Sequence, residues 1–387
     1  MLAKTTTKKF LLDYNKTTPF FADFYAHLPY SLDKRIGYLP LIDNGNFNFG
    51  KNSVHVIDFI PEYVRPKIKT EIQLKLKEIT TVAGYAIDLS AFNTFEDYQT
   101  SMPRKRRQAL ARSLRRLNQC LDVRFSMIQN TITRELYNCL MDSLKEMITR
   151  RFEQRPEESE TLKVWDRLFE ETYDLIMQGN ASLYVCYNQE QPIFISLNYH
   201  MDKILFGYIS SYDIDYGKFS LGQICVYKHV EWCFDNGYSL FEMGWGDLEY
   251  KKWWSNKIYI FKTQIFYSKN SIFAYLKTQY LALKKSLIAY LIQKKVNIYV
   301  RRLKTNLKQN NTSVNKGVFY KFYDYKLPEN HSYIKLDIGD CTIPKIIIND
   351  FLFISQTNIS NIEIYESNQE KKYILKGNKV TKKLVYT

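Results

Sequence analysis

The stretch FEMGWGDLEYKKWW, residues 241–254, contains the most informative pattern in this chain. It begins with apolar and aromatic residues, which predict a buried strand. Gly244 and Gly246 then predict a tight turn, because glycine adopts backbone angles that other residues avoid. A short amphipathic segment follows the turn. The stretch therefore predicts a strand that ends in a glycine turn, with Asp247 in the turn and Lys251 shortly after it.

The residues on both sides of this stretch alternate between strand and helix patterns. Residues of β type predict strands at 123–128, 183–187, 193–199, 204–210, 238–243 and 258–267. Helical spacing, charge runs and capping signals predict helices at 104–118, 131–152, 160–178, 220–236 and 271–304. At the start of the helix predicted at 220–236, Ser220 and Gln223 match a capping box. This order of elements, with three consecutive antiparallel strands, excludes both a Rossmann fold and an all-β barrel.

The two ends of the chain are expected to differ from the middle. Residues 1–100 contain strand-like segments, with a helix expected at about 65–79. A polar, Asn-rich linker at 305–316 precedes a part in which β-type residues alternate with turns. We therefore predict an α/β (α+β) fold, in which helices flank a mixed sheet and a small β-rich appendage follows. The expected divisions are 1–100, 101–308 and 317–387.

Positive charge is concentrated in two regions. The 387 residues include 55 Lys and Arg against 40 Asp and Glu, a formal net charge of +15. No acidic residue occurs from Tyr250 through Tyr323, a stretch that contains 16 Lys and Arg. A second cluster begins at Arg104 and continues through Arg107. Such patches favour phosphate-bearing partners, which include a cofactor pyrophosphate, anionic lipid headgroups and nucleic acid.

Several classes of protein are excluded by composition. No apolar run approaches the roughly 18–20 residues that cross a bilayer, and the first residues lack the apolar core of a signal peptide. The six cysteines form no CxxC pair, so neither a zinc cage nor a disulfide framework is expected. No metal ligand set stands out. We therefore expect a cytoplasmic protein.

A series of motifs resembles one family. Tyr212-Asp213, then Phe219-Ser220-Leu221-Gly222, then the GxGDxxYKxxW pattern that ends at Trp254 occur in that order. Together with the Arg-rich helix, they resemble the FemAB/CelD-like (BioF-like) branch of the GNAT acyltransferase superfamily. The resemblance covers about residues 100–300. The chain departs from the family in one respect, because the usual pyrophosphate loop, Q/RxxGxG/A, is not present in full.

The resemblance implies where the site lies. In GNAT proteins the central strands splay apart, the pantetheine arm lies in the gap, and the pyrophosphate sits on the amino end of the next helix, which favours anions. The implied cofactor-binding residues are Ser220, Leu221, Gly222 and Gln223. The implied substrate-binding residues are Arg104, Arg107 and Trp254. The cofactor is expected to be an acyl-CoA, acetyl-CoA first, with no metal.

The implied catalytic residues are Asp247, Asp213, Tyr250 and Lys251. Lys251 would meet an anionic substrate group or the oxyanion of the tetrahedral intermediate. Asp247 or Asp213 would accept the proton of the amine, and Tyr250 would return one to the leaving thiolate.

The implied activity is an N-acyltransferase that transfers an acyl group directly to an amine. Relatives act in cell-envelope and polysaccharide biosynthesis, so a small-molecule or glycan amine such as an amino-sugar is the favoured acceptor. One alternative is a Fem-type transferase that uses aminoacyl-tRNA. Another is a non-catalytic adaptor whose basic helix at 271–304 binds anionic membrane or nucleic acid. Peripheral contact with the inner face of an anionic membrane is also expected from the charge.

Overall fold

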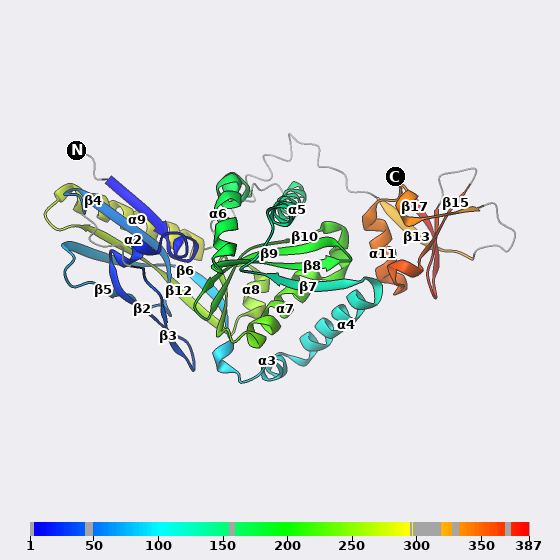
Figure 1. Cartoon of the computed structure of the whole chain (residues 1–387), viewed down its shortest axis with the longest axis horizontal. Coiled ribbons are helices and arrows are strands. Elements are labelled where there is room, and N and C mark those ends of the chain that lie inside the picture. Colours follow the sequence, from blue (N-terminus) through cyan, green and yellow to red (C-terminus); the bar gives the residue numbers. More distant parts are fainter. Residues whose placement is uncertain are drawn as a thin grey trace.

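The computed structural model describes residues 4–42, 49–154, 159–294, 296, 319–326, 333–367 and 373–386. The molecule is elongated, and a large sheet with helices on both faces forms its body (Figure 1). A separate antiparallel sheet forms the end that contains the C-terminus (Figure 1). The expected mixed α/β fold with a small β-rich C-terminal part is therefore confirmed. The linker expected at 305–316 lies outside the described residues.

The nine strands of the large sheet come from two thirds of the chain. They are β1 (Lys4–Lys9), β4 (Ser53–Pro61), β6 (Leu74–Asp88), β7 (Val123–Ile128), β8 (Ala181–Asn188), β9 (Gln191–Met201), β10 (Ile204–Tyr212), β11 (Leu240–Trp245) and β12 (Lys257–Ser268). A three-stranded sheet contains β2 (Tyr25–Ser31), β3 (Ile36–Leu39) and β5 (Lys67–Ile68). The C-terminal sheet contains β13 (Tyr320–Asp324), β14 (Tyr333–Leu336), β15 (Glu363–Ser367), β16 (Tyr373–Lys376) and β17 (Thr381–Tyr386).

The helices connect these strands. The α-helices are α1 (Phe10–Asp13), α2 (Thr18–Ala22), α3 (Phe95–Ser101), α4 (Arg104–Cys120), α5 (Arg134–Glu153), α6 (Trp165–Met177), α7 (Leu221–Asp235), α8 (Glu249–Trp254), α9 (Ile272–Gln293) and α11 (Lys345–Ser355). Short 3-10 helices are η1 (Leu89–Ala91), η2 (Leu162–Val164), η3 (Ile214–Phe219), η4 (Ile338–Asp340) and η5 (Ile359–Asn361). The part of the helix predicted at 271–304 that follows Val296 lies outside the described residues.

The large sheet joins the N-terminal hundred residues to the middle of the chain. Its strand order is β1-β4-β12-β6-β11-β10-β9-β8-β7, in which only β1–β4 and β10–β11 are parallel pairs. β6 lies between β11 and β12 and pairs with both. The sheet therefore crosses the division that the sequence predicted near residue 100.

The prediction of a helix at about 65–79 is wrong, because this region contains β5 and the first part of β6. From Leu76 to Thr81 the side chains alternate between exposed and half-buried, as on a strand with one solvent-facing side. The β-branched residues Ile79, Thr80, Thr81 and Val82 also favour a strand. The period of two, rather than 3.6, decides the structure here.

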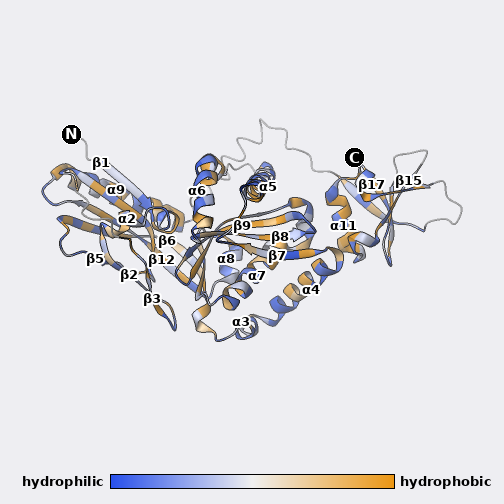
Figure 2. Ribbon diagram, in the orientation of Figure 1, coloured by the Kyte–Doolittle hydropathy of each residue, from blue (hydrophilic) through white to orange (hydrophobic). Residues whose placement is uncertain are grey.

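Helices cover both faces of the sheet. α5 and α6 lie on one face and α7 on the other (Figure 1). Hydrophobic and hydrophilic residues alternate along α4, whose buried residues are Leu110, Leu117 and Cys120 (Figure 2). The start of α5 is fixed by Thr133, whose hydroxyl accepts a hydrogen bond from the Leu136 amide.

β10 and β11 pair over a short distance only. Three residues of each strand are partners, beginning with Ile204 opposite Leu240 and ending with Phe206 opposite Glu242. Beyond this point β10 continues to Tyr212 beside β9, while β11 bends through Gly244, whose φ is +70°. In the part of the chain that the structure describes, the edge of β10 that faces away from β9 has no strand partner beyond Phe206.

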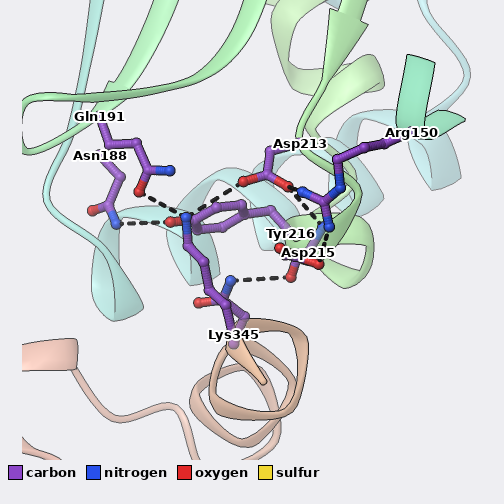
Figure 3. Close-up of polar contacts among 8 residues, drawn as sticks. Arg150, Asn188, Gln191, Asp213, Asp215, Tyr216 and Lys345 are labelled. Atoms are coloured by element: carbon purple, nitrogen blue, oxygen red, sulfur yellow. Dashed lines mark hydrogen bonds and ion pairs between the residues drawn. The ribbon is translucent and has the colours of Figure 1, made fainter. Parts of the chain in front are cut away.

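The C-terminal part packs against the segment between β10 and α7 (Figure 3). The Lys345 ammonium of α11 is 3.4 Å from the Asp213 carboxylate and 4.7 Å from the centre of the Tyr216 ring. The Asn349 side-chain amide donates a hydrogen bond of 3.0 Å to the Asp215 carbonyl. These contacts fix the segment that leads into α7.

Asp213 connects three elements at this junction (Figure 3). Its carboxylate lies 2.9 Å from the Arg150 guanidinium of α5, and it accepts a hydrogen bond from the Asp215 amide at the start of η3. Only 8% of the Asp213 side chain is exposed. Charged hydrogen bonds of this kind are stronger than neutral ones when solvent is excluded.

Replacing Asp213 by Asn should therefore lower the free energy of unfolding by about 1–2 kcal/mol, because Arg150 and Lys345 lose their shared anion but remain partly hydrated. Urea denaturation followed by circular dichroism measures the change. Asp324→Asn is the control, since Asp324 pairs with Lys382 but is 92% exposed. Equal losses in the two variants would show that the buried position of Asp213 does not matter.

Candidate active site

A fully buried carboxylate lies where the pairing of β10 with β11 ends. Glu242 is the last residue of β11 that pairs with β10, and none of its surface is exposed. Its carboxylate accepts hydrogen bonds from the hydroxyls of Tyr63 (2.8 Å) and Tyr259 (2.6 Å) and from the amide of Gly244 (2.6 Å). Burial raises the pKa of Glu242, and these three donors oppose the rise.

Lys251 lies beside this carboxylate. It is 7% exposed, and its ammonium donates a hydrogen bond to the Trp245 carbonyl at the end of β11. Burial lowers the pKa of Lys251 to about 8, although the negative charge of Glu242 raises it. Lys251 is therefore mostly a cation at neutral pH and can lose its proton at mildly alkaline pH, which is unusual for lysine.

Two other residues of the predicted set surround the glycine turn. Asp247 accepts a hydrogen bond of 3.0 Å from the Tyr85 hydroxyl, forms an ion pair with Lys252 and keeps 42% of its side chain exposed. Tyr250 keeps 39% of its surface exposed. Packing around the Tyr250 ring raises the pKa of its hydroxyl, while the charge of Arg151 lowers it. The structure thus brings Asp247, Tyr250 and Lys251 to one turn.

The start of α7 differs from the capping box predicted for it. Ser220 has a φ of +59°, in the left-handed region, and its hydroxyl caps no amide. The Ser220 carbonyl accepts hydrogen bonds from the amides of Gln223 (3.0 Å) and Ile224 (3.2 Å), so α7 begins there without a side-chain cap. The amides of Leu221 and Gly222 precede these first helical bonds and point out of the helix end. Of the predicted set, these two amides are the groups that could bind an anion.

Gln223 is predicted from the sequence to bind the cofactor, and in the structure its side chain holds Trp254. Its side-chain carbonyl accepts a hydrogen bond of 2.8 Å from the indole of Trp254. Trp254 is 2% exposed and supports the first turn of α7, and its substrate-binding role stays a prediction.

Arg151 is a cation that the sequence analysis did not single out. Its guanidinium lies 5.2 Å from the centre of the Tyr212 ring, at the end of β10. The same ring is 3.9 Å from the position that a Gly222 Cβ would occupy. Arg151 therefore lies near both the start of α7 and Tyr250, where a second positive charge would assist anion binding.

The remaining predicted residues lie apart from this cluster or serve the fold. Asp213 is held by Arg150 and Lys345, so its carboxylate is committed to the junction with the C-terminal part. Arg104 is exposed and Arg107 is half-buried on α4. The Arg residue of this run that packs against α8 is Arg106, whose guanidinium lies 4.1 Å from the centre of the Trp254 ring.

The residues that sequence reasoning missed come from distant parts of the chain. Tyr63 follows β4, Tyr259 belongs to β12 and Arg151 ends α5, so no local pattern connects them. Glu242 could have been recognised from the sequence, because it is the charged residue in a strand that is otherwise apolar. A charge at such a position requires buried partners.

Two classes of feature are not found in the part of the chain that the structure describes. No group of three or more His, Cys, Asp or Glu side chains has the geometry to hold a metal ion within these ranges. Among the same residues, no helix has the length and apolar character that crossing a bilayer requires.

A comparison with protein-family models gives a match to the middle of the chain. Residues 104–252 match the family model described as acetyltransferase (GNAT) domain. No curated protein matches the chain. The match begins at the first residue of α4 and ends within α8, so it contains the short β10–β11 pairing, the start of α7 and the glycine turn.

Similar solved structures are distant in sequence. FemX is 10% identical, with a TM-score of 0.41, over 67% of this chain and 92% of that chain. A conserved protein of unknown function from Bacteroides thetaiotaomicron is 10% identical, with a TM-score of 0.39, over 67% and 93%. A GCN5-related N-acetyltransferase from Kribbella flavida is 7% identical, with a TM-score of 0.27, over 57% and 69%. Residues 104–252, which run from α4 into α8, are thus the part of this chain that is similar to the acetyltransferase (GNAT) domain family.

Proposed function

We propose that this protein is an N-acyltransferase that transfers an acyl group from acyl-CoA, acetyl-CoA first, to an amine. The observation that carries the proposal is the end of β10–β11 pairing after Phe206 and Glu242, inside the region that matches the GNAT family. An extended pantetheine arm could hydrogen-bond to the free edge of β10 as an additional strand would.

The donor site follows from the start of α7. The Leu221 and Gly222 amides, together with the positive end of the helix dipole, suit the pyrophosphate of CoA. Arg151 would add a guanidinium from the side of α5. Gly222 has no neighbour closer than 3.9 Å to its missing Cβ, so a phosphate could approach this backbone closely.

The transfer would be direct. The amine nitrogen attacks the thioester carbonyl carbon, a C–N bond forms, the C–S bond breaks, and the amine proton leaves while the thiolate gains one. Lys251, held by the Trp245 carbonyl, would stabilise the oxyanion of the tetrahedral intermediate. Asp247 is the more exposed of the two predicted carboxylates and would accept the amine proton, and Tyr250 would protonate the thiolate.

The favoured acceptor remains an amine of a cell-envelope or polysaccharide precursor, such as an amino-sugar. A second candidate donor is aminoacyl-tRNA, which the exposed Arg residues of α4, including Arg104, Arg112 and Arg115, would suit. Thermal shift assays with acetyl-CoA, longer acyl-CoAs, acyl carrier protein and aminoacyl-tRNA distinguish the donors. Release of free thiol in the presence of a panel of amines then identifies the acceptor.

Gly222→Glu should abolish CoA binding without unfolding the protein, because it places a carboxylate against the pyrophosphate. Glutamate in the first turn of a helix is compatible with the helix dipole, so the free variant should melt near the wild-type temperature. In the wild type, CoA at about 100 Kd should stabilise the fold by roughly 2.7 kcal/mol. Differential scanning calorimetry with and without CoA measures this.

Gly50→Glu is the matched control, because Gly50 is remote and has no atom within 4 Å of its missing Cβ, so glutamate fits there as well. It should bind CoA as the wild type does. If Gly222→Glu retains the full CoA effect, the pyrophosphate does not bind at α7.

Lys251→Met should lower kcat/KM for the amine that supports turnover by about 30- to 150-fold, the effect of losing a charged hydrogen bond worth 2–3 kcal/mol in the transition state. Methionine has a similar length and no charge, so CoA affinity should change little.

Because the ammonium of Lys251 loses its proton as pH rises through about 8, wild-type kcat/KM should have a declining limb above that pH. The variant should lack this limb.

Lys75→Met is the control for net charge, since Lys75 is exposed on β6. Lys252 is unsuitable, because it pairs with Asp247. Equal losses in the Lys251 and Lys75 variants would indicate a general electrostatic effect. Unchanged activity in Lys251→Met would remove Lys251 from the catalytic site.

A further inference from the structure

The outward side of α9 carries an unusual concentration of exposed apolar residues. Of the thirty large hydrophobic side chains that are exposed in the described parts of the chain, eleven belong to this one helix. They are Ile272, Phe273, Tyr275, Leu276, Tyr280, Leu283, Leu287, Ile288, Tyr290, Leu291 and Ile292. An apolar surface of this extent on a folded domain marks an interaction site.

Helical spacing arranges five of these residues in one stripe. Leu276, Tyr280, Leu283, Leu287 and Tyr290 follow one another at steps of four and three, so they share one side of the helix. Leu283 is 71% exposed, and Leu276 and Leu287 are 57% and 55% exposed. We call this side the outer face of α9.

The opposite side of α9 is committed to the sheet. Ala274, Thr278 and Ala282 are buried, and α9 packs on β6, β12 and β4. Lys285 also points to this side, where its ammonium lies 2.7 Å from the Asp58 carboxylate of β4. The small buried residues allow α9 to lie close to the strands, so the large side chains of the outer face do not serve the core.

The charges around the outer face have one sign. Lys277 and Lys284 lie seven residues apart on the same flank, and Lys294 follows the end of the helix. Their ammonium groups accompany exposed Tyr rings, since Lys277 lies 5.6 Å from the centre of Tyr280 and Lys294 lies 5.8 Å from that of Tyr290. The sequence from Tyr250 through Tyr323 contains no acidic residue that would neutralise them.

We propose that the outer face of α9 docks on an anionic lipid bilayer. Leucine and isoleucine would enter the boundary between headgroups and acyl chains, tyrosine suits the interface, and lysine attracts acidic headgroups. Figure 2 shows that both hydrophobic and hydrophilic residues occur along α9.

Charge argues against the other occupants. A second copy placed symmetrically on this face would bring Lys277 and Lys284 against the same positive charges. Nucleic acid would meet the lysines but would leave the leucines of the outer face without an apolar partner. A bilayer with acidic headgroups satisfies both components at once.

The test is co-sedimentation of the full-length protein with vesicles of phosphatidylcholine alone or of phosphatidylcholine mixed with phosphatidylglycerol. The protein should bind the mixed vesicles at least about tenfold more tightly, and high salt should reduce this preference. Leu283→Glu combined with Leu287→Glu should weaken binding to mixed vesicles by more than about tenfold. CoA stabilisation of this variant should stay at the wild-type value.

Two controls localise the effect. Leu136→Glu with Met177→Glu makes the same change at residues that are 40% and 44% exposed on α5 and α6, and it should leave vesicle binding unchanged. Arg112→Gln with Arg115→Gln on α4 should retain the phosphatidylglycerol preference, whereas Lys277→Gln with Lys284→Gln should lose most of it.

Three results would overturn the proposal. The first is equal binding to neutral and acidic vesicles, or no binding to either. The second is an equal loss in the α9 variants and in their controls. The third is a wild-type dimer in light scattering that Leu283→Glu with Leu287→Glu converts to a monomer, which would assign the outer face to a second copy of the chain.

Discussion

The buried carboxylate of Glu242 is the constraint on which the centre of this structure depends. A carboxylate without water must be matched by donors, and here the donors come from three separate segments. Tyr63 contributes from the connection after β4, Tyr259 from β12 and the Gly244 amide from the bend in β11. The same negative charge acts on Lys251. Glu242 thus ties the connection after β4 to β11 and β12 and holds the bend at the end of β11.

The strands around Glu242 come from two distant parts of the chain. The strand that pairs with the outer edge of β11 is β6, from the first hundred residues, and it leaves β10 and β11 paired at only three positions. The bend at Gly244 and the turn that follows carry Asp247, Tyr250 and Lys251 to the place where the pairing ends.

The remaining parts of the chain support this centre in different ways. The C-terminal part packs on the segment before α7, where Lys345 and Arg150 share the Asp213 carboxylate. α9 uses small side chains to pack on the sheet and leaves its large apolar side chains exposed. The first contact orders the segment that leads into α7, and the second leaves a surface that the fold itself does not use.

The sequence by itself determined most elements in the middle of the chain and the position of the glycine turn. Glycines at 244 and 246, the strand before them and the period of apolar residues in α5 and α6 are local patterns, and local backbone preferences act on neighbouring residues. Tertiary structure alone decided which of the candidate site residues lie close together. Asp213 and Trp254 match the motif but are held by distant partners, whereas Arg151 reaches the site without belonging to any motif. The reason is physical, because burial, charge pairing and strand neighbours depend on residues far apart in sequence, and no local pattern encodes them.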